Sequence, residues 1–261
     1  MSDRPAVISG RNLSCLFGSG KKKFHAVKRV SFDIHDQEII SIVGESGSGK
    51  TTLARMILLL QPISEGTLLI NNQHPLHPKK HWQYVQAVFQ DPFASFNQFF
   101  TIKNQLLSAF KLKESKIDQK DKQARIEAAL LQVNMSPEKI LEKYPFELSG
   151  GQMQRLLIAR IFLIRPRILI ADEPTSMVDA CSRATILDML LDLKRKLHMT
   201  IIFITHDIGL AYYVSDRIFV MRNGSIVEQG GPNQVILHPA HSYTQRLLQD
   251  IPVLNRAWLQ N

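Results

Sequence analysis

The segment at residues 44–51 constrains the fold of this 261-residue chain more than any other feature. It fits the pattern G-x-x-x-x-G-K-[S/T] and stands between an apolar run at 39–43 and a helical pattern that begins at Lys50. The loop consists of Gly44, Glu45, Ser46, Gly47, Ser48, Gly49, Lys50 and Thr51. A strand, a glycine-rich loop and a helix in this order form a backbone cradle for phosphate. A chance glycine–serine turn is the alternative, but it does not account for the flanking strand and helix.

Strand-like and helix-like patterns alternate along the rest of the chain. Strands are predicted at 6–13, 30–34, 67–71, 85–89, 168–171, 200–204 and 218–220, and helices at 50–60, 180–196 and 208–214. Such alternation predicts an α/β fold with a parallel sheet covered by helices. The largely helical stretch 91–164 is interpreted as an inserted subdomain, and residues 233–261 as a C-terminal helical extension.

Composition limits the classes of protein to which the chain can belong. Hydrophobic content of 44% and 21% charged residues are ordinary for a folded soluble protein. The net charge of +9 comes from scattered Lys and Arg, which disfavours nucleic acid as a partner. Only two cysteines, Cys15 and Cys181, are present, which suits a reducing cytoplasm.

The sequence shows no apolar signal region at its start and no uninterrupted apolar run of the roughly 20 residues that span a bilayer. The longest candidate, 158–171, is broken by three arginines and Pro166. If the protein serves a membrane process, we expect partner chains to supply the span.

Polar side chains follow three of the predicted strands. Asp172 and Glu173 follow 168–171, His206 follows the strand at 200–204, and Gln90 follows 85–89. Carboxyl ends of strands in an α/β sheet are where ligand chemistry is placed. Asp172 is expected to hold Mg²⁺ and Glu173 to act as general base for attack on a γ-phosphate. A strand simply leaving the core, or a structural histidine, is the alternative for each residue taken alone.

A second glycine-rich loop stands about a hundred residues after the first. It consists of Leu148, Ser149, Gly150, Gly151 and Gln152. Like the first loop it opens a helix, and free backbone N–H groups at a helix start favour anions. Two such cradles on one chain require an explanation.

Taken in order, these motifs resemble the nucleotide-binding domain of an ABC transporter over residues 6–248. The resemblance rests on the phosphate loop at 44–51, Gln90, the signature at 148–152, Asp172 with Glu173, the D-loop at 176–179 and His206. It implies a P-loop NTPase (RecA-like) core with an antiparallel β subdomain and an inserted α-helical subdomain. The expected boundaries are 1–250 for the ABC ATPase domain, with the core at 1–90 and 165–232.

The resemblance also implies cofactors and residue roles. ATP and Mg²⁺ are the expected cofactors. Two domains pair head to tail, so that the signature residues Ser149, Gly150, Gly151 and Gln152 contact nucleotide held by the partner, which accounts for the second cradle. Phe17 is expected to stack on adenine, with a core role as the alternative, and Thr52 to contact the α-phosphate. Asp179 joins the nucleotide contacts, and the metal ligands are Thr51, Gln90 and Asp172. Lys50, Gln90, Glu173 and His206 form the catalytic set.

Three features that are less specific than the catalytic motifs resemble those of the oligopeptide/dipeptide/nickel importer group. They are the residues around Gln90, the 224–230 spacing and the tail at 238–244 followed by Leu247 and Leu248. This implies a partner ATPase, expected to be a paralogous chain with a homodimer as the alternative. It also implies two permeases, one of whose helices is received near 93–100, and indirectly an extracytoplasmic solute-binding protein. The expected location is peripheral, on the cytoplasmic face of the membrane.

Some features depart from the family or lie outside it. The D-loop carries Met177 and Val178 where the family usually has Ala and Leu, for which we expect altered packing at the dimer seam. No Cys follows Cys181, so no iron–sulfur cluster is expected. The histidines at 74–81 are interpreted as an exposed connection between strands rather than a metal site, because prolines and lysines surround them.

The sequence therefore predicts an importer ATPase whose solute is peptide-like, an oligosaccharide or a metal chelate. The rival hypothesis is a soluble ABC ATPase acting on DNA or ribosomes. Only about 58 residues separate Gln90 from Ser149, too few for a long coiled coil. A nucleotide sensor without turnover is a third hypothesis, and it conflicts with the intact Glu173 and His206.

Overall fold

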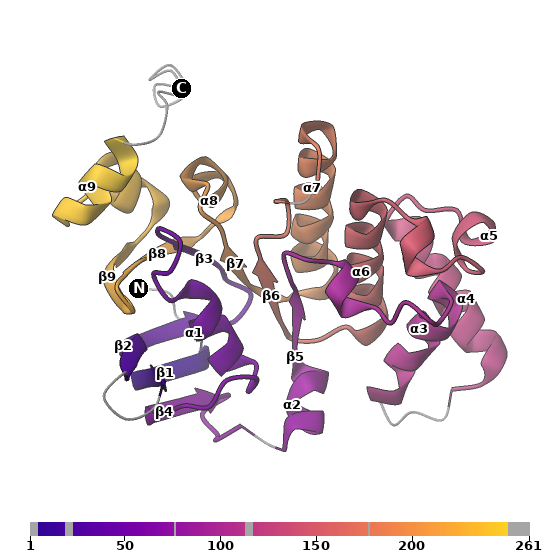
Figure 1. The fold of residues 1–261 in the computed structure, drawn as a ribbon, viewed down its shortest axis with the longest axis horizontal. Coiled ribbons are helices and arrows are strands. Elements are labelled where there is room, and N and C mark those ends of the chain that lie inside the picture. Colours follow the sequence, from indigo (N-terminus) through magenta and orange to yellow (C-terminus); the bar gives the residue numbers. More distant parts are fainter. Residues whose placement is uncertain (1–4, 19–22, 76, 113–116, 177, 250–261) are drawn as a thin grey trace. The chain divides into compact units, whose positions relative to one another are not determined.

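The computed structural model describes residues 5–18, 23–75, 77–112, 117–176 and 178–249. The chain divides into two compact units (Figure 1). Of the described residues, those within 35–37 and 73–202 form unit 1, and those within 5–34, 38–72 and 203–249 form unit 2.

Unit 2 holds the phosphate-loop segment and two groups of strands. The strands β1 (Ala6–Phe17), β2 (Phe24–His35) and β4 (Glu65–Ile70) form a three-stranded sheet in the order β2-β1-β4. β1 and β4 are antiparallel, with Ile8 opposite Ile70 and an irregularity between Arg11 and Ser14. This sheet agrees with the expected antiparallel β subdomain.

The second group of strands in unit 2 carries the phosphate loop. β3 (Ile39–Val43) pairs in parallel with β8 (Arg217–Arg222), and β8 pairs antiparallel with β9 (Ser225–Gly230). All five β3 residues are buried, which explains their apolar, mostly β-branched composition. The helices of this unit are α1 (Lys50–Ile57), α8 (Ile208–Val214) and α9 (Ser242–Gln249), and a π-helical turn covers Asn233–Leu237.

Unit 1 contains parallel strands and most of the helices. β5 (Val85–Val88) pairs in parallel with β6 (Ile168–Asp172), in a register that sets Val88 opposite Ala171. β7 (Thr200–Ile204) begins here and ends in unit 2. The helices are α2 (Pro78–Tyr84), α3 (Ile102–Ser108), α4 (Gln119–Gln132), α5 (Pro137–Ile140), α6 (Gly150–Ile164) and α7 (Ala180–Leu197). Single 3₁₀ turns lie at Phe93–Ser95, Ala109–Leu112 and Pro145–Glu147.

The core of unit 1 centres on β6 and α6. Every residue of β6 is buried, and α6 buries nine residues, including Met153 and Ile161. Figure 1 shows α3, α4, α5 and α6 gathered together, which agrees with a helical stretch between Gln90 and β6. The exact subdomain boundaries predicted from the sequence stay a prediction.

Several predicted elements differ in extent from the observed ones. The helix expected at 50–60 ends at Ile57, because Leu59 has a left-handed backbone with φ of 58°. The first strand continues to Phe17, and β9 was not expected from the sequence. The connection expected at 74–81 is exposed at 74 and 77–80, but it includes the start of α2 at Pro78, and the side chain of His81 is buried. Of the C-terminal extension, residues 250–261 lie outside the described residues.

Candidate nucleotide site

The phosphate loop in unit 2 follows β3 directly and depends on glycine at two places. Gly44 and Gly49 have φ of 147° and 105°, a backbone conformation that other residues rarely adopt. A Cβ at Gly44 would lie 2.2 Å from the Met221 carbonyl oxygen, and one at Gly49 would lie 2.4 Å from that of Ala26. The loop therefore packs against neighbouring backbone so closely that it needs glycine for space as well as for conformation.

The side chain of Lys50 is folded into this loop. Its exposed fraction is 7%, and its Nζ donates hydrogen bonds to the carbonyl oxygens of Gly44 at 2.7 Å and Glu45 at 2.8 Å. The turn between β8 and β9 supports the loop from outside, because the Gly224 N–H donates to the Ser48 carbonyl at 2.9 Å. An ammonium group is thus held at the loop, where a phosphate group would need it.

The start of α1 fits an anionic ligand. Gly49 precedes the helix and has no side chain with which to cap it, whereas the first N–H groups of a helix lack intrahelical partners. A helix start also carries partial positive charge. Together with Lys50, Thr51 and Thr52, this loop has the donor set that a nucleoside triphosphate requires.

His206 lies at the same strand edge of unit 2. The Thr205 N–H donates to the Ile42 carbonyl oxygen at 3.3 Å, which holds the end of β7 beside β3 just before Gly44. Asp207 then caps α8 by accepting from the Leu210 N–H at 3.1 Å. His206 is exposed at this turn, as its proposed contact with nucleotide requires.

Phe17 ends β1 in the same unit. Its ring stacks on that of Phe24, with centroids 5.8 Å apart and an angle of 20° between the planes. Phe17 is half-buried and Phe24 is 60% exposed, so the pair presents aromatic surface to solvent. Neither ring is in the deep core, and an adenine contact for Phe17 remains a proposal.

The acidic residues lie at a strand edge of unit 1. Because β5 and β6 are parallel with Val88 opposite Ala171, Gln90 and the pair Asp172–Glu173 follow adjacent strand ends. Asp172 is buried, Glu173 is half-buried and Gln90 is exposed. The structure thus places Gln90 at the strand end next to that of the pair Asp172–Glu173.

The backbone of Glu173 is unusual for a side-chain-bearing residue. Its φ of 48° lies in the left-handed region, and its carbonyl oxygen accepts from the N–H of Ser176 at 3.2 Å and from the Ser176 hydroxyl at 3.0 Å. Such conformations cost free energy and persist where surrounding structure enforces them, which is common at functional sites. The tight turn at the end of β6 thus sets the direction in which the Glu173 side chain leaves the strand.

The signature loop, also in unit 1, differs from the phosphate loop in having its own cap. The Ser149 hydroxyl accepts from the Gln152 N–H at 3.3 Å, and the Gln152 side-chain oxygen accepts from the Ser149 N–H at 2.9 Å. This is a reciprocal capping box at the start of α6. The cap was not predicted from the sequence, although a serine three residues before a glutamine is typical of one.

The D-loop packs beside the signature helix. A Cβ on Gly151 would lie 3.7 Å from Val178 and 3.9 Å from Ser182. Asp179 caps α7, with its carboxylate accepting from the Ser182 N–H and hydroxyl, each at 2.9 Å. Met177, one of the two D-loop departures, lies outside the described residues.

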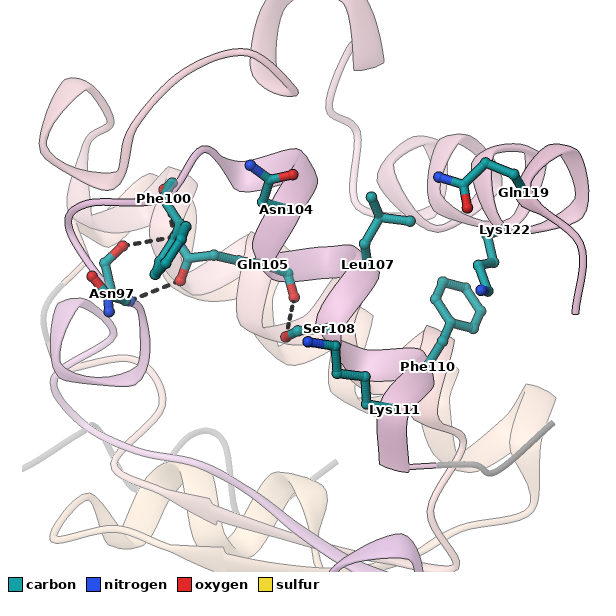
Figure 2. A pocket seen from close by; sticks show the side chains of 10 residues that line it. All are labelled: Asn97, Phe100, Asn104, Gln105, Leu107, Ser108, Phe110, Lys111, Gln119 and Lys122. Atoms are coloured by element: carbon teal, nitrogen blue, oxygen red, sulfur yellow. Dashed lines mark hydrogen bonds between the residues drawn. The ribbon is translucent and has the colours of Figure 1, made fainter. Parts of the chain in front are cut away.

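A pocket lies beside the segment that follows Gln90. It has a volume of about 790 Å³ and is formed by residues of the 97–100 segment, α3, the following turn and α4 (Figure 2). Gln105 organises its rim: its side chain accepts from the Asn97 N–H at 2.7 Å and donates to the Phe100 carbonyl at 2.9 Å. The neighbouring Phe99 is 87% exposed.

Arg160 connects α6 to the same segment. Its guanidinium donates to the Ser95 carbonyl at 3.1 Å and lies over the ring of Phe96, 5.3 Å from its centroid. Burial lowers the pKa of Arg160 below its ordinary value. Arg160 could not be singled out from the sequence, because an arginine inside an apolar helix has no specific local signature.

The described part of the chain contains neither a group of three or more His, Cys, Asp or Glu side chains arranged to hold a metal ion nor a helix long and apolar enough to cross a membrane. The histidines at 74–81 form no such group among those residues. A Mg²⁺ bound with nucleotide takes part of its coordination from phosphate, so it does not need a closed protein cage.

The sequence and the fold were compared with known proteins. A family model described as "ABC transporter" matches residues 27–176. The peptidoglycan transport ATP-binding protein YejF of Agrobacterium fabrum is 40% identical over 94% of this chain, which spans only 47% of that relative's length. The oligopeptide transport ATP-binding protein AmiF of Streptococcus pneumoniae is 37% identical, with 95% of this chain and 82% of AmiF covered.

A solved structure agrees with the fold. The ATP-binding cassette MJ0796, in a dimeric post-hydrolysis state bound to ADP and phosphate, superposes with a TM-score of 0.78 at 27% identity. The match covers 86% of this chain and 98% of that one.

Proposed function

Since the chain belongs to the ABC transporter family, we propose that it is the ATP-binding subunit of an importer for a peptide-like solute. Members of this family couple ATP hydrolysis to transport. The observation that carries the proposal is that every nucleotide motif occurs at the strand end or helix start where its chemistry needs it. The buried Lys50 inside the loop at 44–51 is the strongest single case.

Unit 2 contains the residues proposed to bind the nucleotide. Lys50 and the loop backbone hold the β- and γ-phosphates, Thr52 lies next to the α-phosphate, and Phe17 contacts the base. The glycines let the backbone approach the phosphates, and α1 adds the partial positive charge of its N-terminus. His206 lies beside the loop, where it can donate to a phosphate oxygen or the attacking water.

Unit 1 contains the residues proposed to act in hydrolysis. Glu173 takes the proton of the attacking water, and Gln90, at the adjacent strand end, orients that water. Asp172, Thr51 and Gln90 are the proposed ligands of Mg²⁺, which when bound neutralises phosphate charge. Oxygen donors such as hydroxyl, amide and carboxylate are the ligands that this ion prefers.

In this proposal the signature loop belongs to the nucleotide site of a second ATPase subunit. Ser149, Gly150, Gly151 and Gln152 contact nucleotide bound by a second ATPase subunit, and Asp179 lies at the same seam. The dimeric state of MJ0796 supports pairing. A paralogous chain is the proposed partner, with a second copy of this chain as the alternative.

Two permeases are the proposed membrane partners, which makes this chain a peripheral subunit at the cytoplasmic face. The pocket in Figure 2 is the proposed docking surface for a permease helix. Exposed Phe99 and Phe100 offer apolar surface next to it, and Lys111 and Lys122 line it with positive charge. An amphipathic helix with acidic residues on one face fits this combination.

A peptide-like solute is favoured because AmiF is named for oligopeptide transport. Oligosaccharides and metal chelates, which the sequence left open, have less support. A soluble ATPase acting on DNA or ribosomes is not favoured, because both relatives described above are named as transport proteins. The solute itself is contacted by permeases and a solute-binding protein, so no residue of this chain is proposed to select it.

The test is purification of the tagged full chain from membranes, followed by peptide uptake. We expect copurification with two polytopic membrane proteins and labelled-peptide uptake that is lost in cells carrying Lys50→Ala. Recovery of only a membrane-free complex, or uptake unaffected by Lys50→Ala, would contradict the proposal.

A further inference from the structure

The C-terminal helix α9 reaches the phosphate loop through one side chain. The Tyr243 hydroxyl accepts a hydrogen bond from the Glu45 N–H, with 3.1 Å between the heavy atoms. Residues 243 and 45 are almost two hundred positions apart in the sequence, yet both lie in unit 2. This contact was not predicted from the sequence, in which the tail indicated only a helical extension and a resemblance to the importer group.

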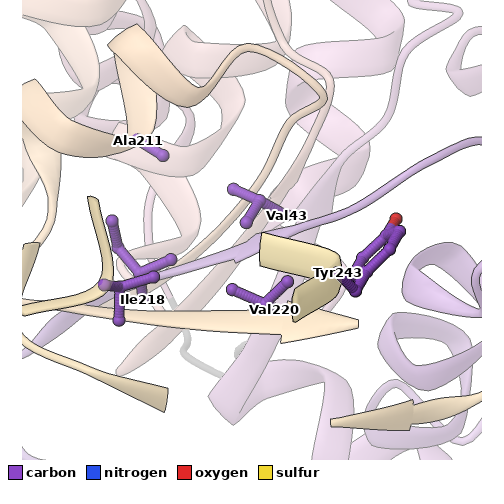
Figure 3. Close-up of a cluster of buried hydrophobic side chains, with 6 residues drawn as sticks. Val43, Ala211, Ile218, Val220 and Tyr243 are labelled. Atoms are coloured by element: carbon purple, nitrogen blue, oxygen red, sulfur yellow. The ribbon is translucent and has the colours of Figure 1, made fainter. Parts of the chain in front are cut away.

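The Tyr243 ring is fixed in the core of unit 2. Its exposed fraction is 3%, and it belongs to a cluster with Val43, Ala211, Ile218, Val220 and Val235 (Figure 3). Val43 is the last residue of β3, immediately before the loop. On another side the Arg222 guanidinium lies over the ring, 4.8 Å from its centroid. A side chain packed in this way holds its hydroxyl in one place.

The segment that leads into α9 is also anchored. The Glu228 carboxylate, on β9, accepts from the N–H groups of Ala240 at 2.8 Å and His241 at 3.1 Å. Burial acts to raise the pKa of Glu228, but hydrogen bonds to its charged form outweigh this and leave that pKa below 4.5. The His241 Nδ1 accepts from the Tyr243 N–H at 3.0 Å. Tyr243 therefore approaches the loop from a segment that is itself held to the sheet.

Tyr243 and Lys50 form hydrogen bonds with opposite ends of the same peptide group. The Glu45 N–H and the Gly44 carbonyl belong to the same planar peptide unit. Tyr243 binds the N–H, and the Lys50 ammonium binds that carbonyl at 2.7 Å. Rotation of this peptide would break both hydrogen bonds at once, so the tyrosine hydroxyl and the lysine ammonium stabilise each other's geometry.

We propose that Tyr243 is a positioning residue for the phosphate loop: it fixes the 44–45 peptide and, through it, the position of the Lys50 ammonium. This rests on the proposed function, in which the loop binds nucleotide. Because the tyrosine orders the loop before nucleotide arrives, it lowers the conformational entropy that binding must remove. The tail thereby becomes part of the nucleotide site without contacting the nucleotide.

Tyr243→Phe in the full chain tests this proposal, with Tyr212→Phe as the matched control. Tyr212 also forms a hydroxyl hydrogen bond in unit 2: it donates to Asn233 Oδ1 at 2.9 Å, and this bond does not involve the loop. Affinity for a fluorescent ATP analogue, the thermal midpoint and amide hydrogen exchange of the 44–51 segment are measured for all three proteins. Both variants keep their ring and lose one hydroxyl, so a general effect on folding changes both thermal midpoints alike.

We expect Tyr243→Phe to weaken ATP-analogue affinity about 3- to 10-fold, the range that losing one hydrogen bond produces. Exchange at the Glu45 amide rises in this variant, whereas Tyr212→Phe leaves affinity and loop exchange at the wild-type level. Equal affinities in the two variants, or unchanged exchange in the loop, overturn the proposal. If the wild-type chain itself binds no ATP analogue, the proposed function fails instead, and the exchange comparison still decides whether Tyr243 orders the loop.

Discussion

The chain contains two glycine-rich loops that each open a helix, and they satisfy that helix start in opposite ways. The loop before α1 ends in Gly49, which offers no capping side chain, and it holds a buried lysine against its own carbonyls. The loop before α6 begins with Ser149, which forms a complete capping box with Gln152. Glycine content alone would make the two loops equivalent.

This difference separates two kinds of anion site. The first loop has glycines forced into left-handed or crowded positions and a cation inside it, so it suits an anionic ligand. The second is stable without a ligand, because its serine and glutamine satisfy each other. It therefore suits a contact that forms only when another subunit presents a phosphate.

The largest expected effect tests the positive charge of Lys50, which distinguishes the first loop from the second. Lys50→Ala removes the only ammonium bound to the Gly44 and Glu45 carbonyls among the described hydrogen bonds. We expect nucleotide affinity to fall by at least about 100-fold, because charge-assisted hydrogen bonds to phosphate are lost. Fluorescent-nucleotide titration measures this. Lys139→Ala, at an exposed lysine of unit 1, is the control; equal affinity in both variants would refute the role of Lys50.

The second prediction separates binding from turnover. Glu173→Gln keeps the shape of the side chain and removes its basicity. We expect nucleotide affinity to stay near the wild-type value while turnover of the assembled transporter falls about 10²- to 10⁴-fold, the range for loss of general-base catalysis. A phosphate-release assay and size-exclusion chromatography with ATP check this, and the variant should accumulate as a closed dimer. Normal turnover would contradict the role of Glu173 as general base. Glu142→Gln, at an exposed carboxylate, serves as the control.

A pair of glycine substitutions tests the backbone difference directly. Gly49→Ala forces a Cβ to within 2.4 Å of the Ala26 carbonyl at a φ of 105°, so we expect a loss of about 2–4 kcal/mol in the free energy of unfolding. Gly151→Ala meets only Val178 and Ser182 at ordinary distances. Here the helix should gain about 0.5–1 kcal/mol. Urea unfolding measures both, and similar losses in the two variants would break the comparison.

The smallest expected effect concerns the cap. Ser149→Ala should cost about 1 kcal/mol of stability, the usual value for an N-cap. Thr101→Ala is the matched control, because Thr101 caps α3 by accepting from the Asn104 N–H. We expect similar stability losses by thermal unfolding but a weaker ATP-dependent dimer only for Ser149→Ala. A dimer weakened equally by both substitutions would show that the signature serine acts only as a cap.

The sequence by itself determined the elements and their order. Local patterns suffice for this, because a strand, a glycine-rich loop and a helix start are specified by neighbouring residues. The loop at 44–51, the buried strand before Asp172 and the helix after Asp207 could therefore be predicted. So could the family, because its motifs are short and occur in a set order.

Only the tertiary structure decided which distant residues support the site. The hydrogen bonds between Tyr243 and Glu45 and between Arg160 and Ser95 have no local sequence pattern, because each joins segments far apart in the chain. The burial of His81 and the left-handed turn at Glu173 likewise follow from packing around them. The physical reason is that sequence patterns indicate what a residue does within its own helix, strand or loop. Hydrogen bonds across a core depend instead on which distant segments the fold brings together.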